Sequence, residues 1–464
     1  MKSRASNSRI TISPAREAAF EILLRIDREG SYASELLHSQ KYQGLSEVDH
    51  SLATEIVMGV LRWRSLVDSE IAAKSSQPLS KLDLEVLTAL RLALYQLRYL
   101  DRVPAWAAIN SSVELVKRAR KRSAAPFVNA ILRKFASDTS AKEKQPALVA
   151  DSATPKKISE SCAHPLWLVE RWTQNYGIEA ALRICRQNQS IPGTAIRLRD
   201  PEAEARLRAE GIELARGAIL SSARIVQHGD ITKTAAFKQG LCVIQDEASQ
   251  LVAALVGRGA SVLDCCAAPG GKTLAIADQN PHAGIAALEL HPHRAALLKR
   301  LLSAHSPNLN RGSRAIQVIA GDARNLPFAS HFDRVLADVP CSGTGTLARN
   351  PEIKWRLKAA DLADLQARQV AILRSAMKQV AVGGRLIYST CSLEKEENEE
   401  VIERALVDES SFRVLECAEE LELLRQQGEL TLPDIASLTR GPFLRTIPGI
   451  HPCDGFFAAV LKKV

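Results

Sequence analysis

From about Leu241 to the end of the chain, short apolar runs alternate with segments of helical periodicity. The predicted strands lie at 261–264, 284–289, 315–320, 334–338, 384–389 and 455–461, and helical patterns such as 362–380 fill the intervals. Such alternation predicts an α/β fold with a doubly wound, mainly parallel sheet. Ligands of such sheets bind at the carboxyl ends of the strands, so the residues that follow each strand are the first candidates for a site.

The first third of the chain has a different pattern. In residues 14–136 apolar side chains recur at helical spacing, as at Leu90 and Leu94, which predicts an all-α bundle. Ser, Thr, Lys and Pro interrupt this pattern at 137–160 and predict a linker. Mixed signals up to Gly240, with a strand at Thr194–Leu198, predict a small α+β subdomain. Since 464 residues are too many for one ordinary core, we expect two or three domains, and the patterns along the chain divide it into 14–140, 160–240 and 241–464.

Charge and cysteine usage narrow the functional classes. The net charge is +9, and residues 1–140 carry +6 of it, with 21 Lys and Arg against 15 Asp and Glu. This excess is compatible with binding of RNA or DNA, and equally with a simple role in solubility. The nine cysteines show no C-x-x-C pair and no zinc-like His/Cys spacing, so we expect no metal and a reducing, cytoplasmic location. No apolar run is long enough to cross a bilayer, and we expect no membrane association.

The stretch LDCCAAPGGKT at 263–273 follows the first predicted strand and opens a helix. Its small residues allow close approach of a ligand to the backbone, and free amides gather at the helix N-terminus. A P-loop would need a glycine where Cys266 stands, and a dinucleotide G-x-G-x-x-G is also absent. Glu289 ends the second strand and Asp322 follows the third, where carboxylates can bind ribose hydroxyls and an adenine amino group. Each acid alone is more often a helix cap or a loop residue, but their recurrence at strand ends predicts an adenosine-containing ligand without a polyphosphate.

Two cysteines end the next two strands: Cys341 in DVPCSGTG at 338–345, and Cys391 in YSTCS at 388–392. A single cysteine is usually a small buried apolar residue. A pair at a ligand-binding edge, with Asp338 opening one of the motifs, is placed for chemistry. A redox pair is the alternative, although it leaves Asp338 and the loop at 263–273 without a role.

These residue types fit methylation of a pyrimidine carbon. C5 of cytosine is too weak a nucleophile to take a methyl group, but a thiolate added at C6 turns the ring into an enamine that is nucleophilic at C5. A carboxylic acid near N3 offsets the developing charge by proton donation or hydrogen bonding, and a base then removes the C5 proton so that the thiol can leave. Spacing alone does not say which cysteine attacks.

At these motifs the sequence resembles the bacterial RsmB (Fmu) family of rRNA cytosine-5 methyltransferases, within the NOL1/NOP2/Sun group. The resemblance spans nearly the whole chain and includes QDEASQLVA at 245–253, RNPEIKW at 349–355, YSTCSLEKEENE at 388–399 and DGFFAAVL at 454–461. The helical N-terminus is similar to the RNA-binding NusB-like domain, notably in FVNA at 127–130, beside the basic run at 117–122. The implied architecture is a NusB-like domain, a small α+β subdomain and a Rossmann-like methyltransferase domain.

The resemblance implies S-adenosylmethionine as cofactor and a cytosine of small-subunit (16S-type) rRNA as substrate. It implies Cys391 as the nucleophile at C6, Cys341 as the thiol that assists product release, and Asp338 as a contact of the cytosine. The residues that would surround the cofactor are Cys266, Ala267, Ala268, Pro269, Gly270, Gly271, Lys272, Glu289, Asp322 and Asp338. Lys272 could bind the cofactor or neutralise local carboxylates.

Two further residues have interpretations of their own. Cys265 stands where the family has an apolar or small residue, and we interpret it as a packing residue. Asn398 could cap the helix that follows it, which we favour, or orient the Cys391 loop.

The chain is expected to act as a monomer on a flipped-out cytosine. Two alternatives stay open: a tRNA cytosine-5 methyltransferase, and a non-catalytic RNA-binding ribosome assembly factor.

Overall fold

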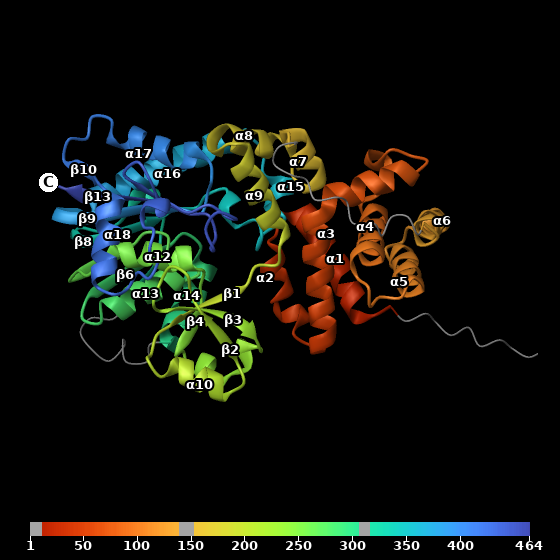
Figure 1. Ribbon diagram of the computed structural model, residues 1–464, viewed down its shortest axis with the longest axis horizontal. Helices are drawn as coiled ribbons and strands as arrows, with labels where there is room; N and C mark the ends of the chain where they lie inside the picture. Colours follow the sequence, from red (N-terminus) through yellow and green to blue (C-terminus); the bar gives the residue numbers. More distant parts are fainter. Residues whose placement is uncertain (1–11, 139–152, 306–315) are drawn as a thin grey trace, which may run out of the picture. The chain divides into compact units, whose positions relative to one another are not determined.

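The computed structural model describes residues 12–138, 153–305 and 316–464. The chain forms two compact units: Met1–Ser190 with Leu347–Arg356, and Ile191–Thr346 with Leu357–Val464. Over the described residues the first unit is helical, and the second contains two β-sheets (Figure 1). No helix in these three described ranges is long and apolar enough to span a membrane.

The first unit is a bundle of α1 (Pro14–Glu29), α2 (Ala33–Leu37), α3 (Glu47–Lys74), α4 (Leu84–Tyr99), α5 (Ala105–Arg118), α6 (Ala125–Ala136), α7 (Pro155–Ser161), α8 (Leu166–Tyr176), α9 (Ile178–Gln189) and α15 (Ile353–Arg356). Local signals set the bounds of α1: the Ser13 side chain accepts a hydrogen bond from the amide of Arg16, and Gly30 ends the helix with φ of 65°. Leu90 and Leu94 are fully buried in the bundle core. The predicted all-α N-terminal fold is confirmed.

The predicted linker at 137–160 is wrong at its C-terminal end, while residues 139–152 lie outside the described residues. Thr154 caps α7 by accepting a hydrogen bond from the amide of Lys157 at 3.2 Å, and a proline stands at the first helical position. These are ordinary signals of a helix start. Helices α8 and α9 bury Trp172 and Ile184 within the first unit. The boundary between the units, at Ser190, therefore falls inside the segment 160–240.

The first unit also contains Leu347–Arg356, a segment from the C-terminal half of the chain that we call the strap. Lys354 of the strap is fully buried, and its amine donates hydrogen bonds to the carbonyls of Arg62 at 2.9 Å and Ala163 at 3.0 Å. The indole of Trp355 donates to the carbonyl of Leu61 at 2.6 Å. Burial lowers the pKa of Lys354 from 10.5 to about 7. The strap is thus fixed by backbone carbonyls of the bundle.

The large sheet of the second unit has the order β11-β12-β13-β9-β8-β5-β6-β7, with β10 paired to β13. Its strands are β5 (Ser261–Asp264), β6 (Gly284–Glu289), β7 (Ile316–Ala320), β8 (Phe332–Asp338), β9 (Val380–Thr390), β10 (Phe412–Leu415), β11 (Thr439–Arg440), β12 (Phe443–Arg445) and β13 (Phe457–Lys463). Strands β9, β8, β5, β6 and β7 run parallel, and β13 pairs antiparallel with β9. The flanking helices are α12 (Glu247–Val256), α13 (Gly271–Gln279), α14 (Pro292–His305), α16 (Asp361–Lys378), α17 (Glu399–Leu406) and α18 (Cys417–Gln426).

Helices cover both faces of this sheet, because successive side chains of a strand point to opposite faces. Leu336 of β8 and Ile387 of β9 pack in one cluster with residues of α12, α13 and α18. Their neighbours Val335 and Leu386 pack in a second cluster with residues of α16 and α17. The predicted doubly wound, mainly parallel sheet is confirmed.

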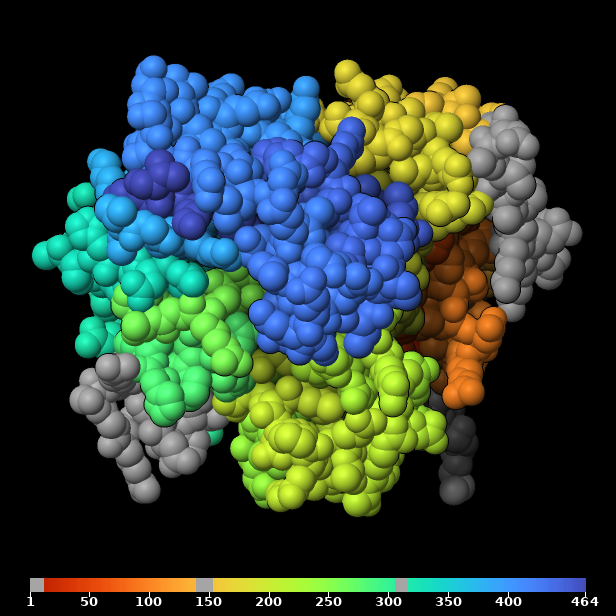
Figure 2. Space-filling view, turned by 60° about the vertical axis from the view of Figure 1, so that its left-hand side comes forward, coloured from red at the N-terminus to blue at the C-terminus, as the bar shows by residue number. Residues whose placement is uncertain are grey.

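A smaller antiparallel sheet has the order β2-β3-β1-β4, built from β1 (Thr194–Leu198), β2 (Glu213–Arg216), β3 (Ala223–His228) and β4 (Cys242–Ile244), with α10 (Ala203–Ala209) and α11 (Ala235–Lys238) beside it. Its strand β1 has the predicted bounds. An isolated bridge joins Leu220 to Leu430. In Figure 2 the C-terminal segment, in blue, accordingly adjoins the yellow-green surface of this part of the second unit.

Candidate active site

The carboxyl ends of the parallel strands meet at one edge of the large sheet. Strand β5 ends at Asp264, β6 at Glu289 and β8 at Asp338. Cys341 lies three residues after the end of β8, and Cys391 follows β9 directly. Since β8 and β9 are paired neighbours, the two cysteine loops come side by side. In the described ranges, no three His, Cys, Asp or Glu side chains gather so that they could hold a metal ion.

The two predicted cysteines are in contact. Sγ of Cys341 lies 3.3 Å from Sγ of Cys391, and both residues are half-buried. The amide of Gly345 donates to the carbonyl of Cys391 at 2.9 Å, which joins the two loops. The hydrogen bond with Cys391, together with burial, raises the pKa of Cys341 well above 9.0. At neutral pH Cys341 is therefore a thiol, and its S–H can be directed at the other sulfur.

Asp338 is held by two hydrogen-bond donors. Nζ of Lys272 lies 2.8 Å from Oδ2 of Asp338, and the hydroxyl of Ser389 donates to Oδ1 at 2.7 Å. Burial opposes the charge on Lys272, but the Asp338 carboxylate outweighs it and raises the pKa of Lys272 above 10.5. The same Nζ lies 4.8 Å from the centre of the Phe456 ring. Lys272 could either bind the cofactor or neutralise local carboxylates, and in the structure its amine contacts the carboxylate of Asp338.

The loop between β5 and α13 contains the predicted residues Cys266, Ala267, Ala268, Pro269 and Gly270, and Gly271 begins α13. Asp264 fixes its start, because Oδ2 of this buried carboxylate accepts a hydrogen bond from the hydroxyl of Thr273 at 2.7 Å. Burial raises the pKa of Asp264 to about 6. Gly270 has φ of 116°, and a Cβ there would lie 2.6 Å from Cδ1 of Leu298, so the loop needs glycine at this position. Cys265 is fully buried in the core, as expected of a packing residue.

Glu289 and Asp322, the two acids predicted to bind an adenosine group, already have hydrogen-bond partners within the protein. Oε1 of the buried Glu289 accepts a hydrogen bond from the amide of His291 at 3.0 Å, and the guanidinium of Arg294 lies 3.8 Å away. Asp322 pairs with Arg324 at 2.6 Å and also accepts from its backbone amide, and these hydrogen bonds lower the pKa of Asp322. Asp322 therefore has the capping role that is usual for such an acid. A ligand at Asp322 would have to share its carboxylate with Arg324.

The run after Cys391 contributes two polar residues to this site. Oδ1 of Asn398 accepts from the hydroxyl of Thr390 at 2.6 Å, and its Nδ2 donates to the carbonyl of Ser392 at 2.9 Å. The favoured capping role is wrong: the side chain makes no capping hydrogen bond to α17, because both ends of its amide are engaged by the Cys391 loop. Glu397, for which the sequence predicts no role, is fully buried and contacts both cysteine loops. An acidic run is usually solvated surface, and no sequence signal separates Glu397 from its neighbours.

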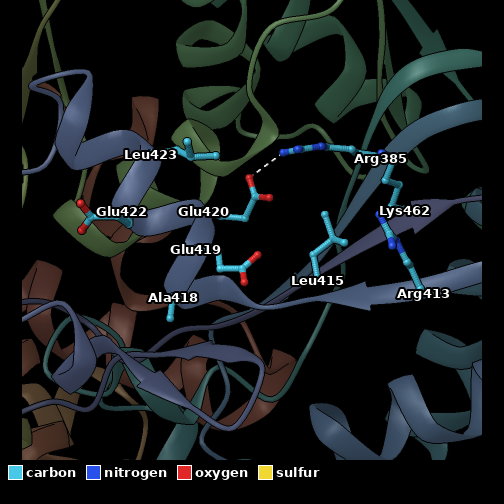
Figure 3. Close-up of a pocket in the computed structure, with 9 residues that line it drawn as sticks. All are labelled: Arg385, Arg413, Leu415, Ala418, Glu419, Glu420, Glu422, Leu423 and Lys462. Carbon is cyan, nitrogen blue, oxygen red and sulfur yellow. Dashed lines mark hydrogen bonds and ion pairs between the residues drawn. The ribbon is translucent and has the colours of Figure 1, made fainter.

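A cavity of about 610 Å³ lies at the other end of the same sheet (Figure 3). Arg413, Lys462 and Arg385 occupy directly paired positions of β10, β13 and β9, and α18 places acidic side chains opposite them. An ion pair of 2.5 Å joins Arg385 to Glu420. Along β9, Arg385 precedes Cys391 by six residues, roughly 20 Å at the usual rise of a strand. This cavity is lined by charged side chains of α18 and of the facing strands, and it is remote from Cys341 and Cys391.

Known families and relatives match most of the chain. A family model described as 16S rRNA methyltransferase RsmB/F matches residues 255–462, and a model of the NusB family matches residues 13–137. The chain is 33% identical over 460 residues to the probable ribosomal RNA small subunit methyltransferase B of Bacillus subtilis, covering 97% of this chain and 98% of that one. It is 34% identical to the protein of the same name from Synechocystis, covering 97% and 99%, and 30% identical to ribosomal RNA small subunit methyltransferase B of Vibrio cholerae, covering 97% and 98%.

Solved structures resemble the fold as well. The crystal structure of PH0851 superposes with a TM-score of 0.77, covers 98% of this chain and 100% of that chain, and is 23% identical in sequence. The structure of NSun6 from Pyrococcus horikoshii with SFG has a TM-score of 0.53, covers 65% of this chain and 98% of that chain, and is 19% identical. At these identities the likeness concerns the fold alone.

Proposed function

The chain belongs to the 16S rRNA methyltransferase RsmB/F family, and we propose that it methylates C5 of a cytosine in small-subunit rRNA, with S-adenosylmethionine as the methyl donor. The names of its full-length relatives support methylation of this RNA, and the NusB family match supports RNA as the partner. The observation that carries the C5 chemistry is the 3.3 Å approach of Cys341 and Cys391 at the ends of adjacent strands.

We expect S-adenosylmethionine at the loop between β5 and α13. Small side chains and the left-handed Gly270 leave room for a close backbone approach, and Glu289 at the end of β6 is placed for ribose hydroxyls. Asp322 would take the adenine, and Lys272 and Asp338 would lie near the reacting end. NSun6, which shares this fold, was solved with SFG, an analogue of S-adenosylmethionine. When bound, the cofactor supplies an electrophilic methyl group.

We assign the attack on C6 to Cys391, whose sulfur is the acceptor when Cys341 donates its S–H. As the S–C6 bond forms, the S–H proton of Cys391 passes to N3 by way of Asp338 or a water, and the electron pair that shifts into the ring toward N3 makes C5 nucleophilic. Asp338 is the group that faces this charge. Because Lys272 and Ser389 both donate to Asp338, we expect the hydrogen bond or proton for N3 to come from these three side chains together.

We assign product release to Cys341. Once C5 carries the methyl group, its remaining proton must leave, so that the electron pair re-forms the double bond and the C6–S bond to Cys391 breaks. Because Cys341 is a thiol in the resting site, it first releases its own proton to solvent, and the resulting thiolate takes the C5 proton directly or through a water. The raised pKa of Cys341 suits this step, because a sulfur that has given up its proton there is a strong base.

Serine variants test the two roles. Cys391→Ser is expected to abolish both turnover and the covalent protein–RNA complex. Cys341→Ser is expected to allow attack but slow release, so that an adduct accumulates on a denaturing gel. Cys453→Ser, at another half-buried cysteine, is the matched control and should keep wild-type turnover. An adduct that forms only with Cys391→Ser would reverse the two assignments.

The substrate is tested by methyl labelling of an unmodified small-subunit rRNA transcript and a tRNA pool in parallel. We expect the label in the rRNA. Label in tRNA alone would refute this substrate, and clear RNA binding without any labelling would support a non-catalytic assembly factor. Bisulfite sequencing of rRNA from a deletion strain then locates the cytosine, which must leave its stack for C6 to be reached.

A further inference from the structure

Glu397 is a buried carboxylate that joins the segments behind the two thiols. Its Oε1 accepts a hydrogen bond from the backbone amide of Ser342 at 2.8 Å, and its Oε2 accepts from the hydroxyl of Ser392 at 2.5 Å and from the hydroxyl of Ser342. Ser342 directly follows Cys341, and Ser392 directly follows Cys391. One carboxylate therefore holds the residue after each cysteine.

The surroundings of Glu397 are unusual for a buried acid. In the described part of the chain no Lys or Arg forms an ion pair with it, and its side chain is fully buried. The side chain has one more hydrogen-bond partner among the described residues, Gln369, whose Nε2 donates to Oε1 at 2.9 Å and also to the carbonyl of Pro340 at 2.9 Å. Burying a carboxylate costs free energy unless hydrogen bonds replace its hydration. A neutral side chain could fill this space at lower cost, so the charge itself calls for an explanation.

We propose that Glu397 is a positioning residue for the methyl transfer proposed above, which holds the loops of Cys341 and Cys391 together and disfavours a negative charge on Cys341. The inference rests on that proposed function. The two loops make further contacts, such as the amide of Gly345 with the carbonyl of Cys391, but Glu397 is the carboxylate that bonds to both Cys-Ser pairs.

The charge of Glu397 acts on one sulfur in particular. After the hydrogen bond with Cys391 and burial, the negative charge of Glu397 is a further cause that raises the pKa of Cys341. Cys341 in turn contributes to the raised pKa of Tyr388, although burial is the main reason that this pKa lies well above 10.0 and the phenol stays neutral. With Cys341 kept as a thiol, its proton stays available for the bond to Cys391. Glu397 would thereby help to decide which of the two sulfurs attacks.

Two substitutions distinguish the effect of the negative charge of Glu397 from the effect of its side-chain length, which lets it bond to both loops. Glu397→Gln keeps the length and one acceptor oxygen but removes the charge. Glu397→Asp keeps the charge but is one methylene shorter, so it cannot bond to both loops at once. Glu247→Gln is the matched control, because Glu247 is also a buried carboxylate of the second unit, and among the described residues its side chain accepts hydrogen bonds only from the backbone amides at 218–220.

The first readout is the pH dependence of alkylation of Cys341 by iodoacetamide, followed by peptide mass spectrometry. A Cys391→Ser background is used, so that Cys341 is observed without the second thiol. We expect Glu397→Gln to lower the midpoint of this pH profile by about one unit, and Glu397→Asp and Glu247→Gln to leave it unchanged. An unchanged midpoint in a folded Glu397→Gln protein overturns the electrostatic part of the proposal.

The second readout is steady-state methyl transfer with Cys391 intact. We expect both Glu397 variants to lower kcat at least tenfold, with KM for RNA and for S-adenosylmethionine within about twofold of wild type. Full turnover in Glu397→Asp overturns the positioning part, and it decides this part even if Glu397→Gln fails to fold. The alkylation profile needs neither RNA nor methyl donor. If wild type labelled no RNA at all, the proposed function would fail while the shift in midpoint would still decide the role of Glu397.

Discussion

Lys354 makes the stability of the helical unit depend on pH in a way that one substitution can isolate. Its amine is fully buried against the carbonyls of Arg62 and Ala163, and burial lowers its pKa from 10.5 to about 7. In the unfolded chain the amine binds a proton up to pH 10.5, whereas in the folded unit it loses that proton above about pH 7. Between these values the unfolded state binds more protons, so stability rises with pH.

The size of this effect follows from the two pKa values. A difference of one pKa unit corresponds to about 1.4 kcal/mol, so keeping the proton on Lys354 below pH 7 costs about 5 kcal/mol of folding free energy. Between pH 6.5 and 8.5 the wild type should gain about 2 kcal/mol of unfolding free energy relative to Lys354→Met. The variant also loses two hydrogen bonds, worth about 1 kcal/mol each, but this loss does not change with pH.

Tryptophan fluorescence can follow this unit separately. All five tryptophans, at 63, 106, 167, 172 and 355, belong to the helical unit or its strap. Urea unfolding at pH 6.5 and 8.5 compares wild type with Lys354→Met and with the control Lys134→Met, an exposed lysine of α6. Three neighbours of Lys354 stay neutral in this pH range, because burial raises the pKa values of Cys162 and Cys185 and lowers that of His164. A stability difference between wild type and Lys354→Met that is equal at both pH values would refute the reasoning.

Three further changes have defined outcomes. Gly345→Ala places a Cβ 2.1 Å from the carbonyl oxygen of Gly455, so the Cys341 loop must shift; methyl transfer should fall at least tenfold, measured by RNA labelling beside a thermal melt. Asp264→Asn removes a carboxyl whose pKa burial raises to about 6, so that the folded wild type binds this proton more tightly than the unfolded chain does. At pH 8 the variant should therefore be more stable than wild type by about 3 kcal/mol, seen in calorimetry as a higher unfolding temperature, and this gain should vanish below pH 4. Gly59→Ala drives a Cβ to within 1.9 Å of the Tyr95 ring and should cost about 2 kcal/mol in urea unfolding followed by tryptophan fluorescence.

The sequence predicted the large sheet well, because its central strands are buried on both faces and therefore appear as continuous apolar runs. Strands β5 and β6 have the predicted bounds, and β7 is described from Ile316 because residue 315 lies outside the described ranges. Strands β8 and β9 begin earlier than predicted, and β13 begins and ends two residues later. Periodicity locates a strand by its buried centre, whereas its ends are set by hydrogen bonds to neighbours that no local pattern reveals.

Contacts between distant segments were beyond local patterns. RNPEIKW is a family-like motif, but nothing in its composition indicates that Lys354 is buried against carbonyls of another part of the chain. Asn398 was assigned to a cap because Asn before a helix usually is one, yet its amide is used by the Cys391 loop. Helix α7 was different, since its capping Thr154 and the proline after it were visible in the sequence. The Ser, Thr, Lys and Pro content of residues 137–160 predicted a linker in spite of this helix-start signal.

The repeated Cys-Ser pair ties the chemistry of the site to its packing. In both loops the serine is buried and the preceding cysteine is half-exposed, so each pair directs a hydroxyl inward and a sulfur toward the ligand-binding edge. Glu397 accepts hydrogen bonds from both hydroxyls, and the sulfurs of the two preceding cysteines lie 3.3 Å apart. A shared carboxylate, placed behind both loops and closer in effect to Cys341, is enough to make two chemically identical side chains unequal.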